Sequence, residues 1–308
     1  MHILQELNEK FPIRRTDEEK QAFRAFLTEY AGRKGVAVKT EQTSDGKNQN
    51  VVIGNADTAQ VFLSAHYDTP ARALFPNLMI PRNKPLFFLF QFLPVILMLA
   101  IALPIAYLVG VEWLNDTRIY FLTFLVLYYV LFFLFFRGGK NPHNYNDNTS
   151  GVATLLAVLD RLSEEEKQRT CLLFFDNEEK GKKGSKAYCA DHPQMQDKLL
   201  VNFDCVANGE HIVFIAKEQA EQKPEYTLLK QAFKNVEPYT VAFYPMRGSE
   251  SNSDYKNFSC GVGCMVCRKT KNGVLYTPYI HTVKDVVANA DTVDLLADKT
   301  TKFIKALS

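Results

Sequence analysis

The chain has 308 residues, a length compatible with two average domains or with one α/β domain that carries an insertion. Its 36 basic residues nearly balance its 34 acidic residues and no polybasic run stands out, so we expect no nucleic-acid partner. The six cysteines are scattered, which argues against a disulfide framework and favours a reducing, cytosol-facing compartment for the polar part.

The N-terminal part of the chain carries signals for one helix followed by short strands. Thr16-Asp17-Glu18-Glu19 is a capping box for a helical pattern that runs to about Arg33. Runs of β-type residues follow at 36–38, 50–53 and 60–65. The pattern predicts strands that belong to a larger sheet.

Two uncharged runs then interrupt the polar sequence. Residues 86–110 are long enough to cross a hydrocarbon core about 30 Å thick as a helix, and residues 119–136 reach the short end of the spanning range. The polar turn between them, residues 111–118, contains an interfacial Trp113. The sequence predicts a transmembrane helical hairpin, residues 82–136, that contacts the lipid bilayer through both runs.

The cations that flank the hairpin predict its orientation. Arg82 and Lys84 precede the first run, Arg137 and Lys140 follow the second, and the turn contains Arg118 as its one cation. By the positive-inside rule, the N-terminus, the C-terminus and the polar domain are cytoplasmic in a membrane protein with two spans. The alternative is an apolar helical pair buried in a soluble core or at an oligomer interface, and a homo-oligomer is compatible with the sequence.

Helix and strand patterns alternate after the hairpin. A periodic helix is expected at 151–162, apolar strand-like runs at 170–175 and 199–203, and an amphipathic helix at 291–307. Strands that alternate with helices predict an α/β fold with a mixed central sheet flanked by helices.

Ionisable side chains follow three of the expected strands. These residues are His66, Asp68, Glu178, Glu179 and Asp204. Ligands in such sheets bind beyond the carboxyl ends of the strands, so we expect these groups to converge, together with Asp147 just before the helix at 151–162. Several carboxylates at one edge of a sheet need a cation to hold them together.

The donor types narrow the choice of cation. Imidazole and carboxylate ligands without thiolates suit Zn, Mn or Co. The His-x-Asp spacing lets Asp68 accept the second ring N–H of His66 and thereby fix the orientation of the imidazole. Cys260, Cys264 and Cys267 are interpreted as part of a buried strand, and a second metal site there is the alternative, although it lacks an evident fourth ligand.

The order of the motifs along the chain carries a family resemblance. The motifs are His66-x-Asp68, Asn146-Asp147-Asn148-Thr149-Ser150-Gly151, Glu178-Glu179, Asp204, Ser253-Asp254 with Phe258, and His281-Thr282 with Asp285. This set resembles the co-catalytic di-zinc aminopeptidase family, which also holds glutamate carboxypeptidase and glutaminyl cyclase branches. The resemblance covers essentially all of the chain outside the hairpin. A related di-zinc family has a separate dimerisation domain, for which the interval 204–281 leaves no room.

The resemblance implies a zinc-exopeptidase-like three-layer sandwich with two divalent metal ions, Zn²⁺ or alternatively Mn²⁺ or Co²⁺. The implied metal ligands are His66, Asp147, Glu179, Asp204 and His281. Asp147 would bridge both metals, Glu179 and His281 would complete one site, and His66 and Asp204 the other.

The resemblance also implies a reaction. Glu178 would act as general base on water held between two metals, and Asp68 would orient His66. Arg247 and Tyr279 lie close to family-type motifs and are candidates for lining the substrate cleft. The implied substrates are peptides, hydrolysed at the N-terminal peptide bond. Alternatives on the same scaffold are a carboxypeptidase, a glutaminyl cyclase with one zinc, and a catalytically inactive membrane receptor or scaffold.

The hairpin is the main departure from the family pattern. It lies between His66 and Asp147, which the family joins by a short connection. The predicted metallopeptidase domain is therefore discontinuous, residues 1–81 and 137–308, with the hairpin 82–136 inserted. Because metal ligands flank the insertion on both sides, we expect the hairpin to emerge close to the metal site.

Overall fold

One mixed β-sheet organises the chain outside the hairpin. The computed structural model describes residues 1–74, 77–136 and 138–307, and within them nine strands form the sheet. Eight strands follow the order β1-β2-β4-β3-β5-β8-β6-β7, and β9 pairs with β8. The strands are β1 (Val38–Gln42), β2 (Gln49–Ile53), β3 (Val61–His66), β4 (Thr170–Phe175), β5 (Leu199–Phe203), β6 (His211–Ala216), β7 (Thr240–Pro245), β8 (Gly261–Lys269) and β9 (Leu275–Tyr276).

The centre of the sheet is parallel. Strand β3 runs parallel to both β4 and β5, and β5 runs parallel to β8. Antiparallel pairs β1–β2, β2–β4 and β6–β8 extend the sheet, and β7 runs parallel to β6 at one edge. The carboxyl ends of β3, β4 and β5 therefore meet at one edge of the sheet.

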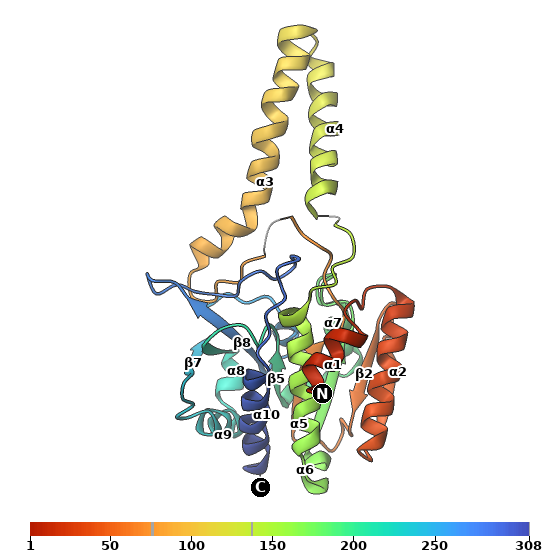
Figure 1. Cartoon of the computed structure of the whole chain (residues 1–308), viewed down its shortest axis with the longest axis vertical. Helices are drawn as coiled ribbons and strands as arrows, with labels where there is room; N and C mark the ends of the chain where they lie inside the picture. Colours follow the sequence, from red (N-terminus) through yellow and green to blue (C-terminus); the bar gives the residue numbers. More distant parts are fainter. Residues whose placement is uncertain (75–76, 137, 308) are drawn as a thin grey trace.

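Helices cover both faces of this sheet (Figure 1). The α-helices of the sheet domain are α1 (Ile3–Lys10), α2 (Asp17–Arg33), α5 (Ser150–Arg161), α6 (Glu164–Arg169), α7 (Lys183–Asp191), α8 (Glu218–Glu221), α9 (Pro224–Ala232) and α10 (Ala290–Lys305). Short π or 3₁₀ turns are η2 (Tyr145–Thr149), η3 (Pro193–Asp197) and η4 (Asp254–Asn257).

Alternate strand side chains enter two separate hydrophobic layers. In β3, Val61, Leu63 and Ala65 pack in the layer of α1, α2, α5, α9 and α10, whereas Phe62 packs in the layer of α7. Successive side chains of a strand point to opposite faces, so a strand buried on both sides reads as a continuous apolar run. This arrangement confirms the predicted α/β fold with a mixed central sheet flanked by helices.

Most local signals in the sequence correspond to observed elements. The capping box is present, because the Thr16 side chain accepts the Glu19 N–H and the Glu19 carboxylate accepts the Thr16 N–H. The strands predicted at 170–175 and 199–203 coincide with β4 and β5. The strand predicted at 36–38 is wrong in its bounds, because β1 begins only at Val38. The N–H of Val36 instead donates a hydrogen bond to the carbonyl of Ala31, at the C-terminal end of α2.

The two apolar runs form a long antiparallel hairpin that rises from the sheet domain (Figure 1). It consists of α3 (Lys84–Tyr107), a π-helical turn η1 (Leu108–Trp113) and α4 (Thr117–Phe136). The spans Lys84–Trp113 and Thr117–Phe136 are long and apolar enough to cross a membrane. In the most apolar 18 residues of each span, 17% and 0% of the residues are buried. Such low burial differs from that of a core helix in a soluble protein.

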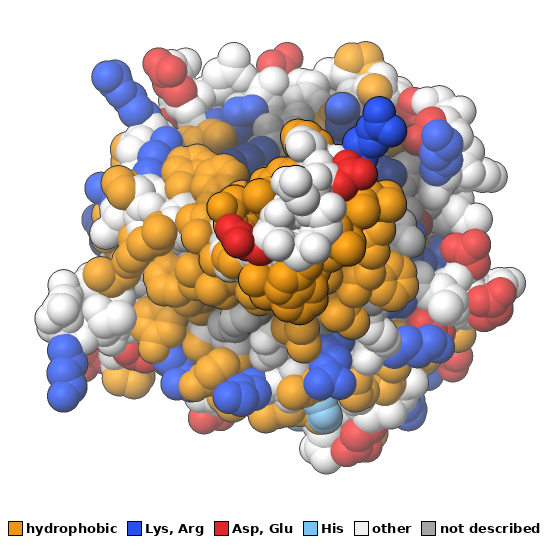
Figure 2. Space-filling view, turned by 90° about the horizontal axis from the view of Figure 1, so that it is seen from above, with side chains coloured by type: hydrophobic (Ala, Val, Ile, Leu, Met, Phe, Trp, Pro, Cys, Tyr) orange, Lys and Arg blue, Asp and Glu red, His pale blue; other side chains and the backbone are white. Residues whose placement is uncertain are grey.

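Side-chain chemistry separates the hairpin from the domain below it. Viewed along the hairpin, hydrophobic side chains gather over it, and charged side chains lie mainly around it on the sheet domain (Figure 2). Arg137, one of the cations used to predict the orientation, lies outside the described residues.

The base of α3 is fixed to the sheet domain by polar contacts. The Asn83 side chain caps α3 by accepting the Leu86 N–H at 3.1 Å. The Arg82 guanidinium donates to the Ser249 hydroxyl at 3.0 Å and lies 4.3 Å from the ring centroid of Tyr244 on β7. These contacts join the start of the hairpin to the sheet domain, so the hairpin base has a defined position beside the strand ends.

Candidate metal centre

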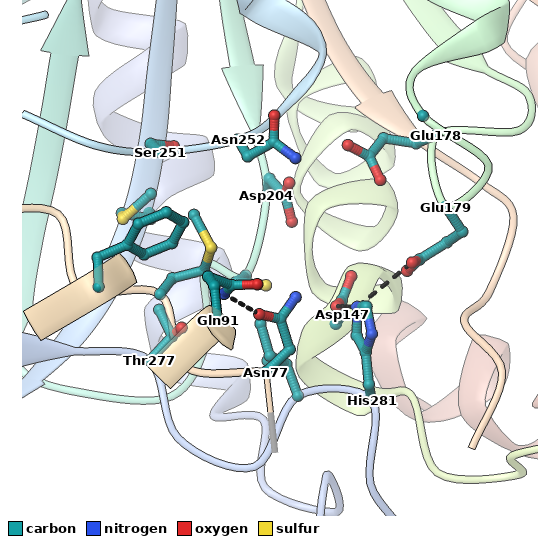
Figure 3. A pocket seen from close by; sticks show the side chains of 16 residues that line it. Asn77, Gln91, Asp147, Glu178, Glu179, Asp204, Ser251, Asn252, Thr277 and His281 are labelled. Carbon is teal, nitrogen blue, oxygen red and sulfur yellow. Dashed lines mark hydrogen bonds and ion pairs between the residues drawn. The ribbon is translucent and has the colours of Figure 1, made fainter. Parts of the chain in front are cut away.

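The predicted metal ligands come from five separate segments and meet at the carboxyl edge of the sheet. His66 ends β3, Asp204 directly follows β5, and Glu179 lies in the turn after β4. Asp147 lies in η2, just before α5, and His281 lies in the loop between β9 and α10. Figure 3 shows four of these side chains directed toward one cavity.

Asp147 is placed between two histidines. Its Oδ1 lies 3.4 Å from Nε2 of His66, and its Oδ2 lies 3.1 Å from Nε2 of His281. The Nε2 of His66 is also 3.7 Å from Oδ1 of Asp204, and the Nε2 of His281 is 3.3 Å from Oε2 of Glu179. Two groups of three possible metal ligands therefore share one carboxylate, and within each group the donor atoms lie within 4.8 Å of one another.

The charges of this cluster are those of a cation site. Burial alone would lower the pKa of His66 and of His281, but neighbouring carboxylates, Asp147 first, outweigh burial and raise both. Burial raises the pKa of Glu179 well above its usual range, and Asp147 and other carboxylates raise it further. The carboxylates thus favour positive charge on the histidines, and a divalent cation could replace those protons.

Unsatisfied atoms give a second test of whether a metal fits. The Oε1 of Glu179 is buried and has no hydrogen-bond partner in the described structure. Oε2 of Glu225 and Oδ2 of Asp254 are the other buried carboxylate oxygens without a partner among the described residues, and a bound ion would satisfy the Glu179 atom. Together with the imidazole and carboxylate donors, this atom fits a divalent transition metal.

The comparison with family models identifies the chain. Residues 139–303, more than half of the sequence, match the model of peptidase family M28. The chain belongs to this family. The match confirms the resemblance described from the motifs, and it includes Asp147, Glu178, Glu179, Asp204 and His281. His66 lies before the matched region, and the fold brings it to the same place.

Solved structures share the fold of this M28 chain. One is the LapA aminopeptidase of Legionella pneumophila, with 12% identity, a TM-score of 0.59, and coverage of 99% of this chain and 69% of that chain. A Zn-dependent exopeptidase from Parabacteroides distasonis has 14% identity, a TM-score of 0.59, and coverage of 98% and 95%. Porphyromonas gingivalis glutaminyl cyclase has 14% identity, a TM-score of 0.60, and coverage of 99% and 96%. No curated protein matched the sequence.

The predicted ligand cluster of the M28 chain opens into a cavity of about 290 Å³. Its acidic side is formed by Asp147, Glu178, Glu179 and Asp204, with His281 beside them. Burial raises the pKa of Glu178 well above its usual range, and nearby carboxylates, including Asp254, contribute to this rise. A raised pKa near a metal site is typical of a carboxylate that exchanges protons.

Asp68 orders the turn that carries the two glutamates. Its Oδ1 accepts the backbone N–H of Glu178 at 3.0 Å, and its Oδ2 accepts that of Glu179 at 3.2 Å. The predicted contact with the imidazole is longer, because Nδ1 of His66 lies 3.6 Å from Oδ1 of Asp68 and 3.1 Å from the Asp68 carbonyl oxygen. Asp68 thus positions His66 through its backbone and the glutamate turn through its carboxylate.

Asp285 orders the backbone at Asp147 in a similar way. Its carboxylate accepts the backbone N–H groups of Asn146 at 3.1 Å and of Asp147 at 3.0 Å. Burial, together with the charge of Asp147, raises the pKa of Asp285 to about 8 despite these two hydrogen bonds. This motif residue therefore fixes the backbone that presents Asp147.

Two buried cations of the N-terminal segment support the site and were not predicted. Arg14 is fully buried and donates hydrogen bonds to the Tyr67 carbonyl and the Thr149 hydroxyl, beside two of the ligand residues. Lys20 is 2% exposed, and its Nζ lies 2.6 Å from Oδ1 of Asp176, at the end of β4. Neither residue belongs to a motif, so the sequence contained no signal for this role.

The structure places the two predicted cleft residues away from the cavity. Arg247 is exposed in the turn after β7 and does not line the cavity. Tyr279 is 38% exposed and lines a neighbouring hollow with Leu74 and Val283. The cavity wall opposite the acidic side includes Asn77 and Gln91 instead, and sequence reasoning had assigned no role to either residue.

Proposed function

We propose that this M28 chain is a membrane-anchored, two-metal aminopeptidase. The single observation that carries the proposal is the shared position of Asp147, whose two carboxylate oxygens face two separate histidines. A carboxylate that serves two ligand groups at once supports a pair of ions rather than one.

We assign His66 and Asp204 to one ion, Glu179 and His281 to the other, and Asp147 to both. The donor set suits Zn²⁺, Mn²⁺ or Co²⁺, and the Parabacteroides distasonis neighbour, a Zn-dependent exopeptidase, favours zinc. A pair of such ions supplies Lewis acidity, which polarises a scissile carbonyl and lowers the pKa of water.

Glu178 is assigned as the general base. It lines the cavity and belongs to neither of the two ligand groups that share Asp147. Its backbone is held by Asp68, and its raised pKa suits a group that accepts a proton from water and passes it to a leaving amine.

The lack of basic side chains in the cavity favours the amino end of a peptide. Neither Lys nor Arg is among the described residues that line it. Two bound ions would neutralise most of the carboxylate charge there, but a C-terminal carboxylate would still lack the basic partner that commonly binds it. This asymmetry supports an aminopeptidase over a carboxypeptidase.

A glutaminyl cyclase is the second candidate, because it would use the same amino end. Two neighbours of similar fold, from Porphyromonas gingivalis and Bacteroides thetaiotaomicron, are glutaminyl cyclases with TM-scores of 0.60 and 0.58. The two ligand groups favour two ions over the single zinc expected of a cyclase. A catalytically inactive receptor is a third alternative. Loss of a metal ligand or of the general base would favour it, but the sequence contains all five implied ligands and Glu178.

The hairpin is proposed to anchor the enzyme in the bilayer. We divide the chain into a metallopeptidase domain, residues 1–81 and 137–308, and the inserted hairpin 82–136. The helix α4 contains no buried residue, which supports contact with lipid rather than with a protein core. Flanking cations, including Arg82 and Lys84, favour a cytoplasmic domain. Association through the hairpin into a homo-oligomer is compatible with this arrangement.

Hydrolysis of paired peptides tests the proposal. Detergent-purified full-length chain is incubated with free-N-terminal and N-acetylated versions of each peptide, alongside Glu178→Gln, and metal content is measured for both proteins. We expect cleavage of the free peptides alone, about two metal ions per chain, and a loss of several orders of magnitude in kcat in the variant. Cyclisation of N-terminal glutamine with one bound ion would identify a cyclase, and bound metal without turnover would indicate the receptor.

A further inference from the structure

Gln91 is an unusual residue for its position in the chain. It is the only strongly polar side chain in the apolar run 86–110. Polar side chains in a membrane helix are costly unless they face protein or a polar cavity, where they commonly have a function. The Nε2 of Gln91 donates a hydrogen bond of 2.7 Å to Oδ1 of Asn77, and both residues line the cavity of the metal centre. Figure 3 shows this pair on the side of the cavity away from Glu178 and Glu179.

Phe87, one turn earlier in α3, gives the same wall an apolar surface. It is 7% exposed and packs in a small hydrophobic cluster with Met79, Cys205 and Ile280, separate from the two layers of the sheet domain. All four residues line the cavity. The hairpin therefore contributes directly to the cavity, and Phe87 extends an apolar surface that lines it.

A second hollow, of about 230 Å³, extends this wall along the base of the hairpin. It shares Asn77, Gln91 and His281 with the first cavity. Its other lining residues are Ala73, Phe90, Pro94, Phe135 and Phe136. The Asn77–Gln91 pair thus lies where the two hollows meet, and the second one is lined mainly by apolar residues of both hairpin helices.

We propose that α3 forms part of the substrate site, where Phe87 and the Asn77–Gln91 pair line a subsite that selects peptides with a large apolar N-terminal residue. This inference rests on the proposed aminopeptidase function, because it places the N-terminal amine at the acidic side of the cavity. An apolar side chain gains free energy by leaving water for this wall, whereas a carboxylate loses hydration and meets neither Lys nor Arg among the described residues of the cavity. The hairpin is then a specificity element as well as an anchor.

Binding to the full-length Glu178→Gln protein in lipid nanodiscs tests the inference apart from turnover. The probes are two matched tripeptides that begin with Leu or Glu, and calorimetry measures each Kd. We expect the Leu peptide to bind at least tenfold more tightly than the Glu peptide. Adding Phe87→Ala should weaken Leu-peptide binding about tenfold, since lost apolar contact in a pocket commonly has effects of this size. Adding Phe88→Ala, the matched control at a 47% exposed neighbour, should change it less than twofold.

Phe87→Leu serves as a milder second variant, and metal content with thermal unfolding shows whether each variant is folded. Equal binding of the two peptides, no measurable binding of either, or unchanged selectivity in folded Phe87 variants overturns the inference. A separate arm measures turnover of the same peptides by the chain with Glu178 intact. Selective binding without turnover supports the inference and contradicts only the hydrolytic function, whereas turnover without selectivity contradicts only the inference.

Discussion

Arg14 and Thr149 lie 135 positions apart in the sequence, and the Arg14 guanidinium donates a hydrogen bond of 3.1 Å to the Thr149 hydroxyl. Thr149 is two residues after Asp147, in η2. A second N–H of the same guanidinium donates to the carbonyl of Tyr67, which lies between His66 and Asp68. One buried cation therefore joins two loops of the predicted metal centre.

We predict that Arg14→Lys weakens both folding and metal binding. A lysine ammonium cannot reproduce the planar fork that reaches two loops at once. Breaking this buried network should lower the free energy of unfolding by about 3 kcal/mol. Because residues that orient metal ligands typically affect affinity by about 10–100-fold, metal affinity should fall at least tenfold. Chemical unfolding and metal titration measure the two effects.

Arg15→Lys is the matched control for this prediction. Arg15 is partly exposed and donates hydrogen bonds to the carbonyls of Gly138 and Gly139. Neither glycine is next to a predicted metal ligand in the sequence. Its replacement should leave metal affinity within about twofold. Unaltered metal affinity in Arg14→Lys would show that the two loops hold their positions without the guanidinium.

The assigned roles predict different metal contents for three amide variants. Asp147→Asn should lose both ions, because an amide cannot serve two cations as a carboxylate does. Glu179→Gln should retain about one ion, and Glu178→Gln about two. Metal analysis after dialysis measures each ratio. His66, Glu178 and Glu179 also form a possible ligand group, so metal loss in Glu178→Gln equal to that in Glu179→Gln would make Glu178 a ligand.

The sequence indicated that the predicted metal ligands lie close together because their signals are local. Asp204 directly follows an apolar run that is strand β5, and the Glu178–Glu179 pair closely follows β4. Since β3, β4 and β5 are parallel neighbours, residues just beyond their ends must come close together. The hydrophobic runs of the hairpin were equally local signals, and two helices of the expected length occupy them.

The supporting residues could not be predicted because their roles depend on packing between distant segments. Burial of Arg14 and Lys20 requires partners at Tyr67, Thr149 and Asp176, which lie far along the chain. The direction of Gln91 depends on how α3 leans on the sheet domain, and no periodic pattern specifies this. Strands β6 and β7 were also not predicted, although both are rich in β-branched and aromatic residues and β6 is a buried apolar run, so a local signal for them was present.

The pKa shifts predict that the metal-free protein loses stability as pH rises. Burial raises the pKa of Asp254 to about 7 and that of Asp285 to about 8, and it raises the pKa of Glu178 and Glu179. Between about pH 4 and pH 8 the folded chain therefore binds more protons than the unfolded chain, and each extra proton lowers the free energy of unfolding by about 1.4 kcal/mol per pH unit. The raised histidine pKa values act in the same direction.

Thermal unfolding at pH 6 and pH 8.5, with a chelator or with saturating Zn²⁺, tests this behaviour. We expect the Tm of the chelated protein to fall with pH and the stabilisation by zinc to grow, because the ion compensates the charged carboxylates. Asp285→Asn should make the fall less steep. A Tm that rises with pH in the chelated protein would show that the charges of the buried carboxylates are balanced by other groups of the protein in the absence of metal.

The hairpin predicts a membrane topology that can be measured by cysteine labelling. Asn115 lies exposed in the turn between the helices, and Lys305 lies exposed at the end of α10 in the sheet domain. If the hairpin spans the bilayer with a cytoplasmic domain, a membrane-impermeant maleimide should label Asn115→Cys in intact spheroplasts. It should label Lys305→Cys only after permeabilisation. The parent chain is the control for its six free native cysteines, five of which are buried.

The two cysteine positions separate the remaining possibilities because the turn between α3 and α4 and the C-terminal end of α10 lie at opposite ends of the molecule (Figure 1). Labelling of Lys305→Cys in intact spheroplasts, with Asn115→Cys protected, would reverse the orientation that the flanking cations favour. Protection of both sites until permeabilisation would mean that the hairpin does not cross the membrane. In that case the exposed apolar surface of the hairpin, including Leu122 at 63% and Tyr129 at 66% exposure, would need a protein partner. Crosslinking through the same cysteines would test whether this partner is a second copy of the chain.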